Sequence, residues 1–187
     1  MKMQPTKPIL LLLFSSTLLI TAAHAEAPLR IGFVYPGPIT DKGWSYRNDQ
    51  GRLAIKNTFG DAVSTIYVER VVEGDQSKLT LDPLSKDNQL IFAASFGYMD
   101  SVMDMAKKYP NVKFEHSGGL KRADNVATYS ARFYEGRYII GMLAGAMTKS
   151  NTIGYVAAMP VPQVMRGINA TMLGIKAVNP QAKIKII

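Results

Sequence analysis

Beyond residue 28, short apolar runs and amphipathic segments alternate along the chain. Apolar runs rich in β-branched side chains are typical of buried strands, whereas apolar positions three or four residues apart are typical of helices. The strands that this pattern predicts in the first part of the chain cover residues 29–35, 62–72, 89–94, 112–116 and 125–129. The helices that it predicts between them cover residues 44–59 and 98–108, with a short or irregular helix within residues 73–88. Such alternation predicts an α/β fold in which helices cover both faces of a parallel sheet.

A long apolar segment, residues 132–148, follows the fifth predicted strand. It is apolar on almost every side from Tyr138 to Met147, and such a helix is normally buried. Gly141 and Gly145 have a spacing that lets a helix pack closely against a neighbour. We therefore predict a buried helix that contacts another helix or a sheet through its glycines.

The last part of the chain predicts the beginning of a second lobe. After a crossover near residue 150, the pattern predicts a strand, a helix and a strand at residues 152–157, 163–178 and 182–187. One helix cannot cover both faces of a parallel sheet, so we expect this second lobe to be incomplete. The predicted organisation is a first ligand-binding lobe over residues 26–149 and the start of a second lobe over residues 150–187.

Residues 1–25 have the features of a secretory signal peptide. Two lysines precede an apolar core at residues 9–23, which is short for a bilayer span, and the Ala-His-Ala sequence that ends at Ala25 fits signal peptidase. An uncleaved membrane anchor is the rival interpretation, but the polar residues 15–17 and the small-residue site favour cleavage. We therefore expect a periplasmic mature protein that begins at Glu26.

Charge and composition narrow the class of protein. The chain has 22 basic and 14 acidic side chains, and cleavage would remove two of the lysines and no acid. The basic residues are dispersed and no nucleic-acid motif is present, so we expect no nucleic-acid partner. The absence of cysteine excludes disulfides, thiolate metal sites and a lipid anchor on cysteine. With two histidines, one of them in the signal peptide, we expect neither a metal cluster nor a histidine-based catalytic relay.

Ligands of open α/β sheets bind at the carboxyl ends of the strands, and three loops at such positions carry candidate contacts. These are Asp41 and Trp44 after the first strand, Ser95, Phe96, Gly97 and Tyr98 after the third, and His116 at the end of the fourth. Each has a structural alternative. Trp44 could pack under its loop, Asp41 could cap a helix, the third loop could be a simple turn, and His116 could be a satisfied structural residue. The binding interpretation predicts a small-molecule site rather than an enzyme.

Sequence motifs with a family-specific order and spacing span almost all of the chain after residue 28. They are residues 31–35 (IGFVY), 40–46 (TDKGWSY), 49–52 (DQGR), 96–100 (FGYMD), 114–116 (FEH), 125–129 (NVATY), 132–138 (RFYEGRY), 153–156 (IGYV) and 166–167 (RG). Together they resemble the basic membrane protein (BMP) family of periplasmic substrate-binding proteins of ABC transporters. Members of that family resemble purine and purine-nucleoside receptors.

The resemblance implies a periplasmic-binding-protein type I-like fold of two Rossmann-like lobes, of which the second is truncated here. It implies a ligand in the cleft between the lobes, a purine base or nucleoside, with neither catalysis nor a cofactor. The implied partner is an ABC permease in the inner membrane, and we expect a monomer. A sugar or amino-acid receptor of the same fold, or a periplasmic sensor for a membrane signalling partner, is the alternative.

The resemblance also bears on individual contacts. In the family's first loop, Asp41 and Trp44 match the pattern whereas Gly43 and Ser45 depart from it, so an aromatic stacking wall at Trp44 is the contact that carries over. Nucleoside-binding relatives resemble one another in having an acid near the end of the fourth strand. Residues 117–119 are Ser-Gly-Gly here, which favours a free base over a nucleoside.

Overall fold

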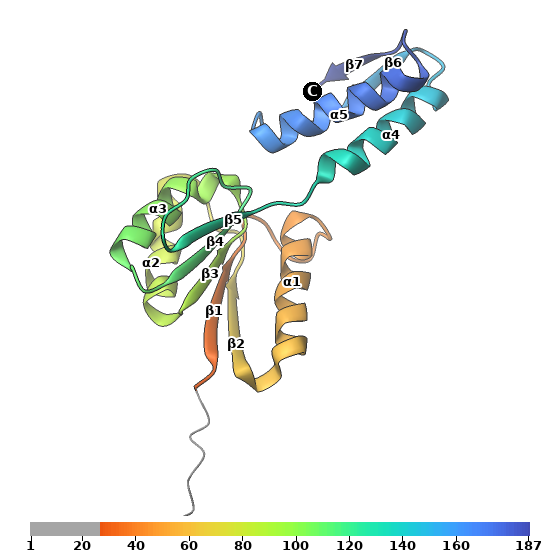
Figure 1. The fold of residues 1–187 in the computed structure, drawn as a ribbon. Helices are drawn as coiled ribbons and strands as arrows, with labels where there is room; N and C mark the ends of the chain where they lie inside the picture. Colours follow the sequence, from red (N-terminus) through yellow and green to blue (C-terminus); the bar gives the residue numbers. More distant parts are fainter. Residues whose placement is uncertain (1–26) are drawn as a thin grey trace, which may run out of the picture.

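The computed structural model describes residues 27–187, and these form two groups of elements joined by residues 130–132 (Figure 1). The first group contains a five-stranded parallel sheet, and the second contains a helix pair and a two-stranded parallel sheet. The signal peptide expected at residues 1–25 lies outside the described residues.

The sheet of the first group has the strand order β2-β1-β3-β4-β5. Its strands are β1 (Leu29–Val34), β2 (Val63–Val68), β3 (Leu90–Ala93), β4 (Lys113–Ser117) and β5 (Val126–Tyr129). All neighbouring strands are parallel, so their carboxyl ends lie at one edge of the sheet. The α/β class predicted from the alternation is confirmed.

Helices lie on both faces of this sheet (Figure 1). They are α1 (Trp44–Phe59) on one face, and α2 (Lys78–Asp87) and α3 (Met99–Lys108) on the other, with 3-10 turns at Gly60–Ala62 (η1), Gly74–Ser77 (η2) and Phe96–Tyr98 (η3). The main core forms where α2 and α3 meet the sheet, around Leu81, Ile91 and Phe114. A smaller cluster around Phe33 lies on the α1 side. The expectation of a short helix within residues 73–88 is confirmed by the ten residues of α2.

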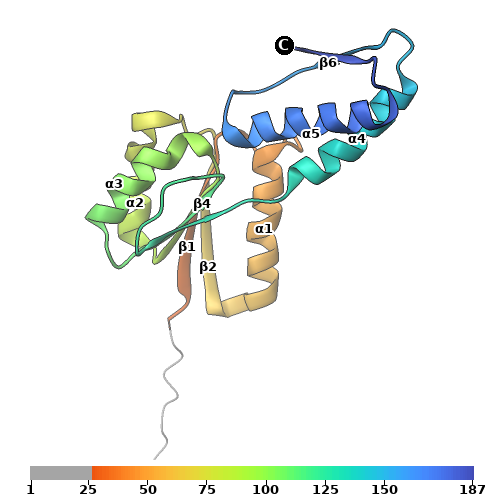
Figure 2. The ribbon, with the colours of Figure 1, turned by 45° about the horizontal axis from the view of Figure 1, so that its top comes forward.

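The second group is built on a close contact between two helices. Its elements are α4 (Phe133–Met147), β6 (Thr152–Tyr155), α5 (Pro162–Val178) and β7 (Lys183–Ile186). Helices α4 and α5 run side by side in both views of the ribbon (Figures 1 and 2). A Cβ atom added to Gly141 would overlap the backbone of Thr171, and one added to Gly174 would overlap the backbone of Tyr138. The prediction that the α4 glycines permit close packing is therefore confirmed, and α5 is the neighbour.

The prediction that α4 is buried is wrong. Only Gly141 and Gly145 of this helix are buried, whereas Ile139 is 63% and Leu143 60% exposed. The glycines face α5. The large apolar side chains of α4 point away from α5, and no other element of residues 27–187 covers them. The predicted first lobe, residues 26–149, includes this helix, whereas in the described chain the helix packs on α5.

No helix within residues 27–187 combines the length and the apolar character needed to cross a membrane.

Candidate ligand-binding site

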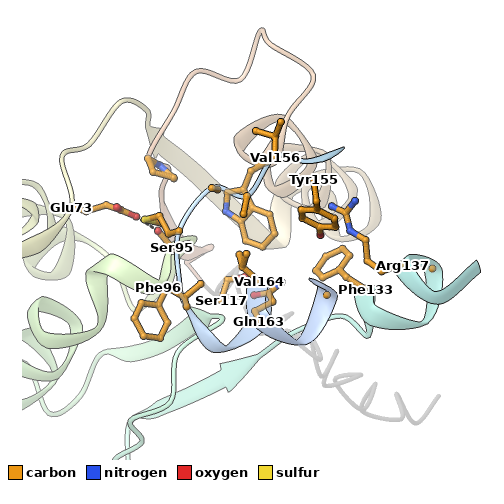
Figure 3. Close-up of a pocket in the computed structure, with 18 of the residues that line it drawn as sticks. Glu73, Ser95, Phe96, Ser117, Phe133, Arg137, Tyr155, Val156, Gln163 and Val164 are labelled. Carbon is orange, nitrogen blue, oxygen red and sulfur yellow. Dashed lines mark hydrogen bonds between the residues drawn. The ribbon is translucent and has the colours of Figure 1, made fainter. Parts of the chain in front are cut away.

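An open cavity of about 960 Å³ lies between the two groups of elements (Figure 3). One wall is formed by loops of the first group. The opposite wall is formed by the start of α4, the loop after β6 and the start of α5. A cavity of this size is in the range of small-molecule sites.

The first wall consists of segments that follow the carboxyl ends of four strands. Pro36 follows β1, residues 71–73 follow β2, Ser95 and Phe96 follow β3, and Ser117 ends β4. Because these strands are parallel, their carboxyl ends meet at one edge, where ligands of open α/β sheets bind. The sheet topology therefore gathers residues that are far apart in the sequence.

Trp44 supplies the largest aromatic surface of the first wall. It is the first residue of α1, and its indole N–H donates a hydrogen bond to the backbone oxygen of Ala94 at 2.5 Å. Trp44 is 40% exposed, and its ring centroid lies 6.1 Å from that of Phe133 on the opposite wall, at an angle of 56°. The hydrogen bond fixes the indole and leaves ring surface open to the cavity.

Glu73 places a carboxylate on the first wall. The Ser95 hydroxyl donates a short hydrogen bond to Glu73 Oε1, and Ser95 Oγ also accepts from the Gly97 N–H at 3.4 Å. A Cβ atom at Gly97 would lie 2.6 Å from Glu73 Cδ, so only glycine leaves room for this side chain. The loop after β3 therefore holds the Glu73 carboxylate at the cavity.

The opposite wall carries hydrogen-bond donors. Arg137 of α4 lies with its guanidinium carbon 5.8 Å from the ring centroid of Tyr155, a cation–π geometry. Gln163, in the first turn of α5, adds a side-chain amide. Apolar residues, among them Ile140, Val156 and Met159, form most of the remaining lining.

Of the seven residues predicted to contact a ligand, Trp44, Ser95 and Phe96 line the cavity, and four do not. Asp41 is exposed, and its Oδ1 accepts the Gly43 N–H at 2.7 Å, a local turn ahead of α1. Gly97 packs against Glu73 behind the wall. Tyr98 is fully buried, and its hydroxyl donates to the Val71 oxygen at 2.8 Å.

His116, the fourth of these, lies under the wall rather than in it. It is 1% exposed, and its Nε2 lies 2.6 Å from the backbone oxygen of Ser95. Because that oxygen can only accept, Nε2 carries the proton, and Nδ1 has no partner among residues 27–187. Burial lowers the pKa of His116 below its usual value, since an imidazolium loses its hydration there. The ring is neutral and supports the Ser95 loop.

Several lining residues were not predicted from the sequence, among them Glu73 and Ser117 on the first wall and Phe133, Arg137, Tyr155 and Gln163 on the second. Glu73 and Ser117 had a detectable signal, because both stand at the carboxyl end of a predicted strand. On the second wall, Tyr155 had a similar signal, because it lies near the carboxyl end of the strand predicted at residues 152–157. Phe133, Arg137 and Gln163 had none, since they lie near the starts of α4 and α5, whose placement depends on the contact between these two helices.

The described residues contain no group of three or more histidine, cysteine, aspartate or glutamate side chains placed to hold a metal ion.

The sequence profile of one protein family, the PnrA-like substrate-binding proteins of ABC transporters (Bmp), matches residues 29–186. The chain belongs to this family. Its members are transporter substrate-binding proteins rather than enzymes, and substrate-binding proteins of ABC transporters work outside the cytoplasm.

Two relatives show how much of a family member is present. A purine-binding protein of Brucella abortus (strain 2308) is 48% identical over 167 residues, which are 89% of this chain and 48% of the relative. A Haloferax volcanii protein named as a candidate ABC transporter glucose-binding protein is 41% identical over 154 residues, which are 82% of this chain and 39% of the relative. The chain thus spans less than half the length of each of these two relatives.

The fold is similar to that of solved solute-binding proteins. An ABC transporter solute-binding protein of Aeropyrum pernix K1 superposes with a TM-score of 0.71 at 20% identity, over 86% of this chain and 47% of that structure. This likeness establishes the α/β architecture of a periplasmic binding protein and spans about half of it.

Proposed function

We propose that this chain is the ligand-binding part of a receptor for an ABC importer and that it binds a purine base in the cavity between its two groups of elements. Trp44 carries the proposal, because a fixed indole with open ring surface is the kind of wall on which a flat heteroaromatic ring stacks. The family and the purine-binding relative from Brucella support it.

The end of β4 favours a free base over a nucleoside, and the Glu73 carboxylate of the same wall stands after β2 instead. Residues 117–119 at the end of β4 carry no acid that could bind ribose hydroxyls, and Gly118 has a φ of 72° that turns the chain there. A nucleoside is the second candidate within the same class, and adenine against adenosine is the direct comparison.

A sugar is the second candidate class. The relative from Haloferax volcanii is named for glucose, and an indole face also suits the apolar face of a sugar ring. Titration with glucose beside adenine separates the two classes, because the purine proposal predicts no saturable signal with glucose.

The proposal also covers the export, the oligomeric state and the transport partner of the receptor. We infer that the signal peptide is cleaved after Ala25, that the mature protein is a periplasmic monomer, and that an ABC permease of the inner membrane receives the ligand. We also infer that α4 and residues 150–187 are parts of the second lobe. N-terminal sequencing of a periplasmic extract tests the cleavage, and Met1 retained in a membrane fraction would contradict it.

Trp44 is the sole tryptophan of the chain, so the tryptophan fluorescence of the protein reports on the proposed site and tests the proposal. Adenine, guanine or hypoxanthine should change its fluorescence in a saturable way. In calorimetric titration, Trp44→Ala should weaken binding by about 1–3 kcal/mol, the range for stacking of a base on an aromatic side chain. Phe59→Ala is the matched control, because Phe59 is an exposed aromatic residue at the other end of the same helix. Unchanged affinity in Trp44→Ala would refute the stacking role.

A further inference from the structure

The polar groups of the cavity are divided between its walls. On the first wall, the Trp44 N–H is occupied by Ala94 and the Ser95 hydroxyl by Glu73. Neither of these two donors is available to a ligand. Ser117 adds a hydroxyl to this wall, and Glu73 is the carboxylate among its lining residues. On the opposite wall, Arg137 and Gln163 present N–H donors (Figure 3).

We propose that Glu73 is a specificity-determining residue that accepts an N–H from the exocyclic amino group of an aminopurine such as adenine. The inference rests on the proposed function, because it concerns the edge of a purine that occupies the same cavity. It names the exocyclic amino group as the purine substituent that the site distinguishes.

The position of Glu73 is fixed from two sides. Ser95 donates to Oε1, and Gly97 packs against the carboxyl carbon, so the side chain has little freedom to turn away. Its second oxygen, Oε2, has no hydrogen-bond partner among residues 27–187 and is not among their buried unpaired atoms. An accessible carboxylate oxygen that is held on the same cavity wall as Trp44 is an acceptor prepared for a ligand donor.

An exocyclic amino group satisfies this acceptor better than a ring nitrogen does. A carboxylate only accepts hydrogen bonds, and an amino group offers two N–H donors outside the ring. Ring protons of a free purine move between N7 and N9, whereas the amino group donates in either tautomer. The opposite edge of adenine carries N3, which accepts in either tautomer and suits the N–H groups of Arg137 and Gln163.

The arrangement also disfavours anionic ligands at the first wall. A carboxylate on the ligand would face Glu73 at short range, and two like charges at a partly desolvated site repel one another. Amino acids and sugar acids are therefore poorer ligands for this wall than a neutral base with a donor edge.

The test is a cycle of two ligands and three proteins, measured by calorimetric titration of the full chain. The ligands are adenine and unsubstituted purine, which differ by the amino group alone. The proteins are the wild type, Glu73→Gln, and Glu69→Gln as the matched control. Glu69 lies four residues earlier, accepts the Ile39 N–H at 2.8 Å and does not line the cavity. Thermal unfolding of all three proteins verifies that each is folded.

The wild type should bind adenine about 10-fold to 100-fold more tightly than purine, the range for a hydrogen bond to a charged group. Glu73→Gln should reduce that preference several-fold, because its amide oxygen is a neutral acceptor, while binding purine within about 3-fold of the wild type, and Glu69→Gln should keep the preference. Equal affinity of the wild type for adenine and purine would overturn the proposal, and this comparison remains valid if Glu73→Gln fails to fold. A Glu73→Gln variant that weakens both ligands equally would also overturn it. If no purine binds the wild type at all, the proposed function itself fails, and the role of Glu73 fails with it.

Discussion

The two groups of elements are built from the same kind of βα units, yet they hold together in different ways. In the first, α2 and α3 pack on a five-stranded sheet, and Leu81 and Ile91 are fully buried. In the second, the helix pair meets through glycine backbones, and the large apolar side chains of α4 are exposed. An apolar sequence therefore predicts where burial is favourable, whereas actual burial requires a neighbouring element.

Paired leucines give the largest expected difference between the two groups. Leu81→Ala should lower the free energy of unfolding by about 2–5 kcal/mol, because it leaves a cavity in the main core. Leu143→Ala, at a side chain that is 60% exposed, should change it by less than about 0.5 kcal/mol. Urea unfolding of both variants is the measurement, and similar losses would show that the surface of α4 is covered in solution.

A smaller loss should follow from adding one methyl group to the helix contact. Gly174→Ala places a Cβ atom against the Tyr138 backbone, so α4 and α5 must separate, at a cost of about 1–3 kcal/mol. Gly167→Ala on the same helix is the control, since its Cβ atom would meet Arg137 at an ordinary 3.6 Å. The main core should stay intact in both, which hydrogen exchange of β1 and β3 amides can verify. Exchange that rises equally in both groups would contradict a separate α4–α5 contact.

The smallest expected effect is a pH dependence confined to the first group. The folded pKa of His116 lies below its unfolded value of about 6.5, so the unfolded chain binds the proton first as the pH falls. His116 therefore contributes stability that is present above about pH 6.5 and is lost below it, with a slope of at most about 1.4 kcal/mol per pH unit.

The measurement is the free energy of unfolding of the wild type and of His116→Asn between pH 7.5 and about 5. The difference between the two proteins isolates the contribution of His116, because the other histidine, His24, is common to both. The slope of the wild type should be steeper. Identical slopes would mean that the imidazole is hydrated in the folded protein.

The sequence predicted the fold of the first group almost element by element, because strands buried between two helical layers are short apolar runs with clear boundaries. The helix that begins at Trp44 and ends before Gly60 matches the prediction at both ends. The burial of α4 was not predictable in this way. Its apolar positions surround the helix, so the sequence does not tell which face meets a partner.

The site was partly predictable for a related reason. The rule that ligands bind at the carboxyl ends of parallel strands located the loops of Trp44 and Ser95. The rule does not tell whether a side chain at the carboxyl end of a strand points into the cavity or is buried beneath its wall. Tyr98 and His116 stand at such strand ends and are buried. Glu73 also stands at the end of a predicted strand, but its orientation depends on a hydrogen bond to Ser95, across 22 positions of sequence, which the sequence pattern does not reveal.

The contact between His116 and Gly119 constrains how this loop can change during evolution. A Cβ atom at position 119 would overlap the imidazole ring, so no side chain can be added there while histidine occupies position 116. A smaller side chain must therefore replace His116 before a residue with a Cβ atom can replace Gly119. In a comparison of many family members, the two positions should covary, with glycine at 119 wherever 116 is a large ring.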